Sequence, residues 1–160
     1  MKQSTLATWL KAIILGAAVC GLIVYGLVLP ELGLMVVEEF PGEADPMFIP
    51  WLVFLCATGL PCYAALFCGW KIAGNIGRDR SFSMENARLF TWIAGLAAGD
   101  TAFFFLGNVV FLLINWSHPS VVLAALLLCF VGVAVTVAAS VLSHLVRKAA
   151  ALQEQSDLTI

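Results

Sequence analysis

The chain has 160 residues, of which 62% are hydrophobic and only 11% are charged, and its formal net charge is −2. A soluble domain is about 45–50% apolar and about 25% charged, and a domain of this size buries only about two-thirds of its surface on folding. The composition therefore excludes a soluble globular domain. It predicts an integral membrane protein.

Four apolar segments are long enough to cross a bilayer as helices. The expected spans are residues 12–29, 48–70, 87–114 and 121–146. They are separated by an outer acidic loop (30–47), a cytoplasmic loop (71–86) and an outer turn (115–120), and a cytoplasmic tail (147–160) follows. The pattern predicts an all-α polytopic membrane protein, a single domain with four transmembrane helices in an antiparallel bundle.

Prolines and a capping residue set the expected ends of these helices. Pro30 is expected to end the first span, with the apolar stretch 32–37 lying along the membrane surface. Pro61, near the middle of the second span, is expected to kink it and to free the carbonyl of Ala57. Ser83 is a good N-cap for the third helix, and Glu85 in its first turn suits the helix dipole.

The basic residues decide the predicted orientation. All eight fall on one side of the four expected spans: Lys2, Lys11, Lys71, Arg78, Arg80, Arg88, Arg147 and Lys148. Five acids and no Lys or Arg occupy the outer loop 30–47. Because an excess of Lys and Arg marks the cytoplasmic side, both termini of this multi-pass protein are predicted to lie on the cytoplasmic side of the cell membrane.

Asp100 lies near the middle of the third span, where a carboxylate costs about 2.5–3.5 kcal/mol on insertion scales. No Lys, Arg or His is expected at its depth, so the group should be protonated or hydrogen-bonded, with Thr58 and Tyr25 as candidate partners. One interpretation is a proton- or cation-responsive site between the second and third helices. The alternative is a structural hydrogen bond between helices, worth about 0.6 kcal/mol on average.

The remaining candidate residues are two glycines, five cysteines and two histidines, and none of them forms a catalytic group. Gly95 and Gly99 have the small-residue spacing that lets helices approach closely, with packing inside the chain favoured over a homo-oligomer. The five cysteines all fall in apolar runs and are expected to be buried small hydrophobes. His118 and His144 lie on opposite sides of the membrane. We therefore expect no enzyme, no metal site and no cofactor.

Two segments resemble a known family. The sequence Ser81-Phe82-Ser83-Met84-Glu85-Asn86-Ala87-Arg88-Leu89 and the tail Leu152-Gln153-Glu154-Gln155-Ser156-Asp157-Leu158-Thr159-Ile160 are similar to motifs of the YoaS-like family. These are small, uncharacterised bacterial four-helix membrane proteins. Their genes often neighbour one for a small helix-turn-helix regulator, so the resemblance implies such a protein as a cytoplasmic partner.

The two cytoplasmic segments together suggest a docking surface. Its candidate residues are Arg78, Arg80, Ser81, Phe82, Ser83, Glu85, Asn86, Arg88, Asp157, Leu158, Thr159 and Ile160. An apolar stripe at helical spacing (Leu142, Leu145, Val146, Ala149, Leu152) extends the last helix into the tail, and Leu158 and Ile160 form a pair at strand spacing. We expect this end to dock in a groove, on a partner or on the 81–86 loop.

The sequence thus favours a non-enzymatic regulatory or scaffolding membrane protein that contacts lipid and a cytoplasmic protein. We expect no direct binding of nucleic acid. The alternative is a small proton- or cation-coupled transporter or channel that uses Asp100.

Overall fold

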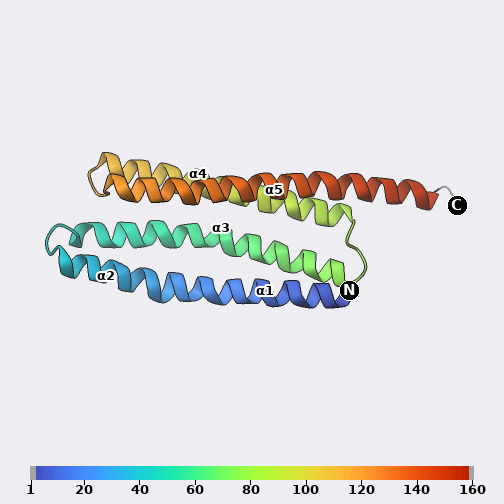
Figure 1. The fold of residues 1–160 in the computed structure, drawn as a ribbon, viewed down its shortest axis with the longest axis horizontal. Helices are drawn as coiled ribbons and strands as arrows, with labels where there is room; N and C mark the ends of the chain where they lie inside the picture. Colours follow the sequence, from blue (N-terminus) through green and yellow to red (C-terminus); the bar gives the residue numbers. More distant parts are fainter. Residues whose placement is uncertain (1–2, 159–160) are drawn as a thin grey trace.

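The computed structural model describes residues 3–158 and, for Asp45, Asp157 and Leu158, only the backbone. Its elements are α1 (Gln3–Ile23), the π-helical turn η1 (Val24–Val28), α2 (Leu29–Glu39), α3 (Asp45–Gly77), α4 (Met84–Leu113) and α5 (Pro119–Leu158). Because α1, η1 and α2 follow without a break, the described chain forms four long rods and has no strand (Figure 1). Each rod is long and apolar enough to cross a membrane, so the all-α class is confirmed and the number of rods is consistent with four spans.

The first rod differs from the prediction at Pro30. The helix does not end there but continues to Glu39, so the expected loop 30–47 is reduced to a turn over residues 40–44. The amide of Leu29 donates to the carbonyl of Val24, five residues earlier. This wide turn accommodates a proline that has no N–H and whose ring would crowd the Gly26 carbonyl in a regular α-helix. The stretch 32–37 is therefore part of the rod.

The other connections are also shorter than expected. α3 continues without interruption through Pro61 to Gly77, so the connection to α4 covers residues 78–83 instead of 71–86. α4 begins at Met84, where the Ser83 hydroxyl accepts a hydrogen bond of 3.2 Å from the Asn86 amide, and Glu85 lies in the first turn. The predicted cap is confirmed. α5 is a single helix of 40 residues that includes the tail to Leu158.

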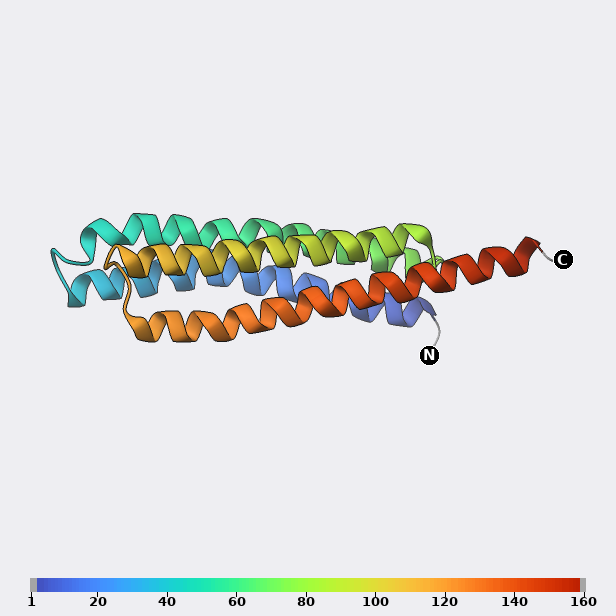
Figure 2. The same ribbon diagram turned by 90° about the horizontal axis from the view of Figure 1, so that it is seen from above.

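The rods pack in chain order and form an open row. α3 contacts α1 and α2, and it also contacts α4, which in turn contacts α5. Within residues 3–158, α5 approaches none of α1, α2 and α3, and Figure 1 shows α1 and α5 on opposite sides of α3. In Figure 2, α5 runs beyond the ends of the other helices. Each terminal rod thus has a single neighbour, so the row does not close into a ring.

Two glycines permit close approach at the interfaces of α4. A Cβ atom at Gly107 of α4 would overlap the Phe54 ring of α3. A Cβ atom at Gly132 of α5 would overlap the hydroxyl of Thr101 on α4. Small residues have this role in membranes because they let van der Waals contacts form without steric conflict. Close approach at these interfaces therefore uses Gly107 and Gly132, which the sequence analysis did not single out.

Gly95 and Gly99 do not pack inside the chain, and this prediction is wrong. A Cβ atom at either position would meet nothing within 4 Å. The buried face of α4 is instead formed by Asn86, Ala87, Ala94, Asn108 and Phe111. Because Gly95 and Gly99 lie on another side of the helix, they face the surroundings of the molecule.

Hydroxyl groups connect α4 to α5 near the N-terminus of α4. The Ser143 hydroxyl donates to the Ala87 carbonyl at 2.7 Å and lies 2.8 Å from the Thr91 hydroxyl. The buried residues of α5 are Ala125, Ala139, Ser143, Val146 and Ala150. Of the stripe expected from the sequence, Val146 is buried, whereas Leu142, Leu145 and Leu152 are exposed. The hydrogen bonds explain this difference, since they turn Ser143 toward α4.

Candidate functional site

We call the end that holds the start of α1, the 78–83 connection and the last turns of α5 the basic end, because the described Lys and Arg residues lie toward it (Figure 1). The opposite end, with residues 31–45 and 114–118, is the acid-bearing end. Two cation–π contacts occur toward the basic end: Lys11 Nζ lies 5.3 Å from the Trp70 ring centroid, and Lys71 Nζ lies 4.8 Å from that of Phe67. These contacts hold two ammonium groups against apolar helix surface.

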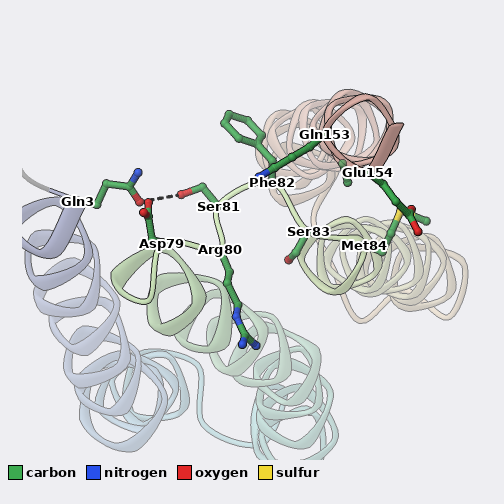
Figure 3. Close-up of a pocket in the computed structure, with 10 residues that line it drawn as sticks. Gln3, Asp79, Arg80, Ser81, Phe82, Ser83, Met84, Gln153 and Glu154 are labelled. Carbon is green, nitrogen blue, oxygen red and sulfur yellow. Dashed lines mark hydrogen bonds between the residues drawn. The ribbon is translucent and has the colours of Figure 1, made fainter. Parts of the chain in front are cut away.

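A cavity of about 580 Å³ lies at the basic end, between the 78–83 connection and α5. It is lined by Gln3, Asp79, Arg80, Ser81, Phe82, Ser83, Met84, Ala150, Gln153 and Glu154 (Figure 3). The structure therefore brings together the two segments that the sequence analysis singled out. Gln3 of α1 joins them through a 3.3 Å hydrogen bond from the Ser81 hydroxyl.

Asn86 holds the 78–83 connection in place. Its side chain is 1% exposed, and its Oδ1 accepts a hydrogen bond of 2.8 Å from Asn75 of α3. Its Nδ2 donates to the carbonyls of Arg80 and Ser81, at 3.1 and 3.0 Å. Every polar atom of this side chain is thus used inside the protein. Asn86 is consequently a structural residue of the site and is not available to a partner.

Two apolar side chains remain exposed beside this network. Phe82 is 59% exposed and Met84 is 45% exposed. In Figure 3 the Arg80 side chain points away from Phe82 and Gln153, although Arg80 lines the cavity. The accessible surface of the cavity is therefore apolar at Phe82 and Met84 and polar at Gln153 and Glu154.

The other predicted docking residues are placed differently. Arg78, Glu85 and Arg88 do not line the cavity. The backbone of α5 is helical to Leu158 and points away from the 81–86 loop in Figure 1, so the expected extended pair is wrong for Leu158. Thr159, Ile160 and the side chains of Asp157 and Leu158 lie outside the described residues. Gln3, Gln153 and Glu154 were missed because only the fold brings these three positions to the loop.

The intramembrane candidate, Asp100, contacts α3 through Cys62. The Cys62 thiol lies 3.6 Å from Asp100 Oδ2, whereas Asp100 Oδ1 is buried without any hydrogen-bond partner. The expected partners bind each other instead: Tyr25 Oη lies 3.3 Å from Thr58 Oγ1, and that hydroxyl donates to the Leu55 carbonyl at 2.7 Å. Sequence inspection missed Cys62, although it follows Thr58 by one helical turn.

A small cavity of about 180 Å³ lies beside this group. Thr58 of α3 lines it together with Asp100, Thr101 and Phe104 of α4 and Leu128, Cys129 and Gly132 of α5. Thr101 donates to the Ala97 carbonyl at 2.7 Å, so the hydroxyl proton is used while the oxygen lone pairs stay free. Thr58 and Asp100 thus share a cavity without bonding to each other. The arrangement can hold a proton on Asp100.

The remaining polar groups do not assemble into a metal site. Within the part of the chain that the structure describes, no three His, Cys, Asp or Glu side chains are placed to hold a metal ion. All five cysteines are free. Cys20, Cys56 and Cys62 are exposed on the outside of the rods, which corrects the expectation that they are buried. In a membrane these thiols face lipid or a neighbouring helix.

Comparison with known proteins agrees with the resemblance seen in the sequence. The family model described as "Protein of unknown function (DUF2975)" matches residues 36–160. Over 163 residues the chain is 26% identical to the uncharacterized membrane protein YoaS of Bacillus subtilis (strain 168), with 99% of each chain covered. No solved structure matches it. With a family model matching most of its length, this membrane protein belongs to the DUF2975 family of proteins of unknown function.

Proposed function

We propose that this protein is a non-enzymatic regulatory or scaffolding protein of the bacterial inner membrane that docks a cytoplasmic protein at its basic end. The observation that supports the proposal is the cavity in which the 78–83 connection meets α5, with Phe82 and Met84 exposed beside it. Exposed aromatic and Met side chains around a concave surface are typical of protein-binding sites. The family resemblance indicates a small helix-turn-helix regulator as the partner.

The proposal requires an antiparallel arrangement with both termini in the cytoplasm. The distribution of Lys and Arg supports this orientation, because the outer segments 30–47 and 115–120 contain neither residue. Cysteines introduced at positions 43, 79 and 156 of a chain without native cysteines provide the test. In intact cells, an impermeant maleimide should label position 43 and leave positions 79 and 156 unlabelled; the reverse pattern would place the cavity outside the cytoplasm.

Docking is tested with the full-length protein in nanodiscs and a small helix-turn-helix regulator, the partner that the family resemblance implies. Replacing both Phe82 and Met84 by Ala should weaken binding by about 30-fold or more, the effect of removing an interface hot spot. The matched control is Leu106→Ala with Leu113→Ala, two exposed apolar residues elsewhere on α4. Equal binding by the two double variants would refute docking at this cavity.

A second function, a proton-coupled transporter or channel, is favoured by one observation. Asp100 Oδ1 is buried without a partner beside a cavity, and an intramembrane carboxyl group is a functional candidate for that reason. A hydrophobic carbodiimide reacts with protonated carboxyl groups inside membranes, so it should modify Asp100 in the folded protein. Asp100→Asn should abolish proton flux into proteoliposomes while regulator binding is unchanged. Flux that survives Asp100→Asn would exclude this role.

A further inference from the structure

A third cavity, of about 390 Å³, lies at the acid-bearing end. Its walls come from α2, from α3, from the first turn of α5 and from the two connections at this end, and they include Val36, Phe48, Trp51, Leu55, Trp116 and Val121. These elements share one end of the molecule in Figure 1. Its size and apolar lining are those of a small-molecule site. None of its lining residues belongs to the predicted docking surface or to the predicted site around Asp100.

The cavity is a fixed part of the fold. It exists because α2 and α5 do not contact each other, which leaves space between them beside α3. A Cβ atom at Gly33 would overlap the Phe48 ring, so this glycine lets the ring lie against α2. The Trp51 indole donates to the Trp116 carbonyl at 3.3 Å, and the two rings flank Phe111 in stacked contacts. The aromatic wall is therefore held by contacts within the protein.

The chemistry of the walls selects an acyl chain as the occupant. Water needs two to four polar partners in a buried site, and this cavity offers few of them. The helices that form it are membrane-spanning segments, so the cavity is reached from the bilayer. Besides the tryptophans, two lining residues are polar: the His118 ring lies within hydrogen-bond distance of the Ser120 hydroxyl, at 2.7 Å, whereas the Ser117 hydroxyl is buried without a hydrogen-bond partner. That hydroxyl can donate to the ester carbonyl of a lipid.

The charges around the cavity select the headgroup. Glu38 and Glu39 follow the lining residues Val36 and Val37 directly, and Glu43 precedes the lining residue Ala44. The sequence has no Lys or Arg between residues 12 and 70 or between 89 and 146, so the basic side chain at this end is the imidazole of His118, and no Lys or Arg neutralises these carboxylates. An anionic headgroup would be repelled here, whereas an ammonium group would be attracted.

We infer that this cavity binds the acyl chain of a membrane phospholipid whose headgroup carries an amine, as in phosphatidylethanolamine. The chain lies against Trp51 and Trp116, and the ammonium group lies toward Glu38, Glu39 and Glu43. The lipid fills the space between α2 and α5, and its binding is independent of docking at the basic end.

The two tryptophans in the wall make the binding measurable. A variant with Trp9, Trp70 and Trp92 replaced by Phe keeps only Trp51 and Trp116 as fluorophores. It is reconstituted in vesicles of phosphatidylethanolamine and phosphatidylglycerol in which one or the other lipid carries brominated acyl chains. Half-maximal quenching should need about fivefold less brominated phosphatidylethanolamine than brominated phosphatidylglycerol, the selectivity of about one favourable charge contact at a membrane surface.

Matched variants separate the cavity from general lipid contact. Val36→Phe fills the cavity and should remove the selectivity, whereas Val133→Phe on α5 should keep it; the two valines are 51% and 52% exposed, and Val133 does not line the cavity. Replacing Glu38, Glu39 and Glu43 by Gln should remove the headgroup preference while quenching by both lipids persists. Equal quenching by the two lipids in the parent, or equal behaviour of the two Phe variants, would overturn the inference.

Native mass spectrometry of the unaltered chain gives a second measurement that does not depend on the Trp replacements. The protein released from mixed micelles should retain one phosphatidylethanolamine in preference to phosphatidylglycerol, and Val36→Phe should lose this adduct. A preference for phosphatidylglycerol, or no retained lipid, would contradict the assigned headgroup.

Discussion

At the basic end every polar atom of the Asn86 side chain has a partner, whereas in the middle of the bundle one carboxyl oxygen of Asp100 has none. Both residues lie on α4 and both face α3. The difference between them is therefore in the hydrogen-bond partners that surround each side chain. A satisfied buried network fixes the shape of the backbone around it. A buried polar atom without a partner lowers stability, so its presence calls for another explanation. The comparison separates a structural asparagine from a candidate functional aspartate.

The largest effect is expected from breaking the satisfied network. Asn86→Ala leaves Asn75 Nδ2 and the carbonyls of Arg80 and Ser81 without their partners, which should destabilise the protein by about 3 kcal/mol. Urea unfolding in detergent micelles, followed by tryptophan fluorescence, measures the change. Gln153→Ala, at an exposed position that lines the cavity beside the 78–83 connection, is the control and should be neutral. A neutral Asn86→Ala would show that the network does not hold the connection.

A smaller effect of opposite sign is expected at the unsatisfied group. Asp100→Leu removes a buried polar atom that has no partner and should stabilise the protein by about 2 kcal/mol. The same unfolding experiment measures it, with Asp100→Asn for comparison, since the amide keeps the polarity of the site. Destabilisation by Leu would mean that Asp100 makes a contact on which the packing of α3 and α4 depends.

The smallest effect tests the cavity beside Asp100. Gly132→Ala should destabilise by about 1 kcal/mol, because the new methyl group displaces Thr101 and the higher helix propensity of Ala offsets part of that cost. The matched variant Gly95→Ala meets no neighbouring atom and should stabilise by about 0.5–1 kcal/mol. If the two variants behave alike, Gly132 is not a point of close approach.

Several features of the protein could be predicted from local sequence. The four spans follow from the length of the apolar segments, since a backbone in lipid must satisfy its own hydrogen bonds as a helix. Ser83 was recognised as a cap because a cap needs only a hydroxyl one residue before the helix. The family was recognised from the residues of the 81–89 segment and of the tail.

Other features were decided only by the tertiary structure. Local sequence predicts that Pro30 ends a helix, but the π-helical turn at Val24–Val28 lets the rod continue to Glu39. Gly95 and Gly99 had the spacing of a packing face, yet α4 packs through another face, and Cys62 instead of Thr58 contacts Asp100. In a membrane the hydrophobic effect does not determine which side of a helix packs against another helix, because lipid is as apolar as Leu. The packing face is determined by how side chains from distant parts of the chain fit together, such as Phe54 against Gly107. A local sequence pattern cannot predict this fit.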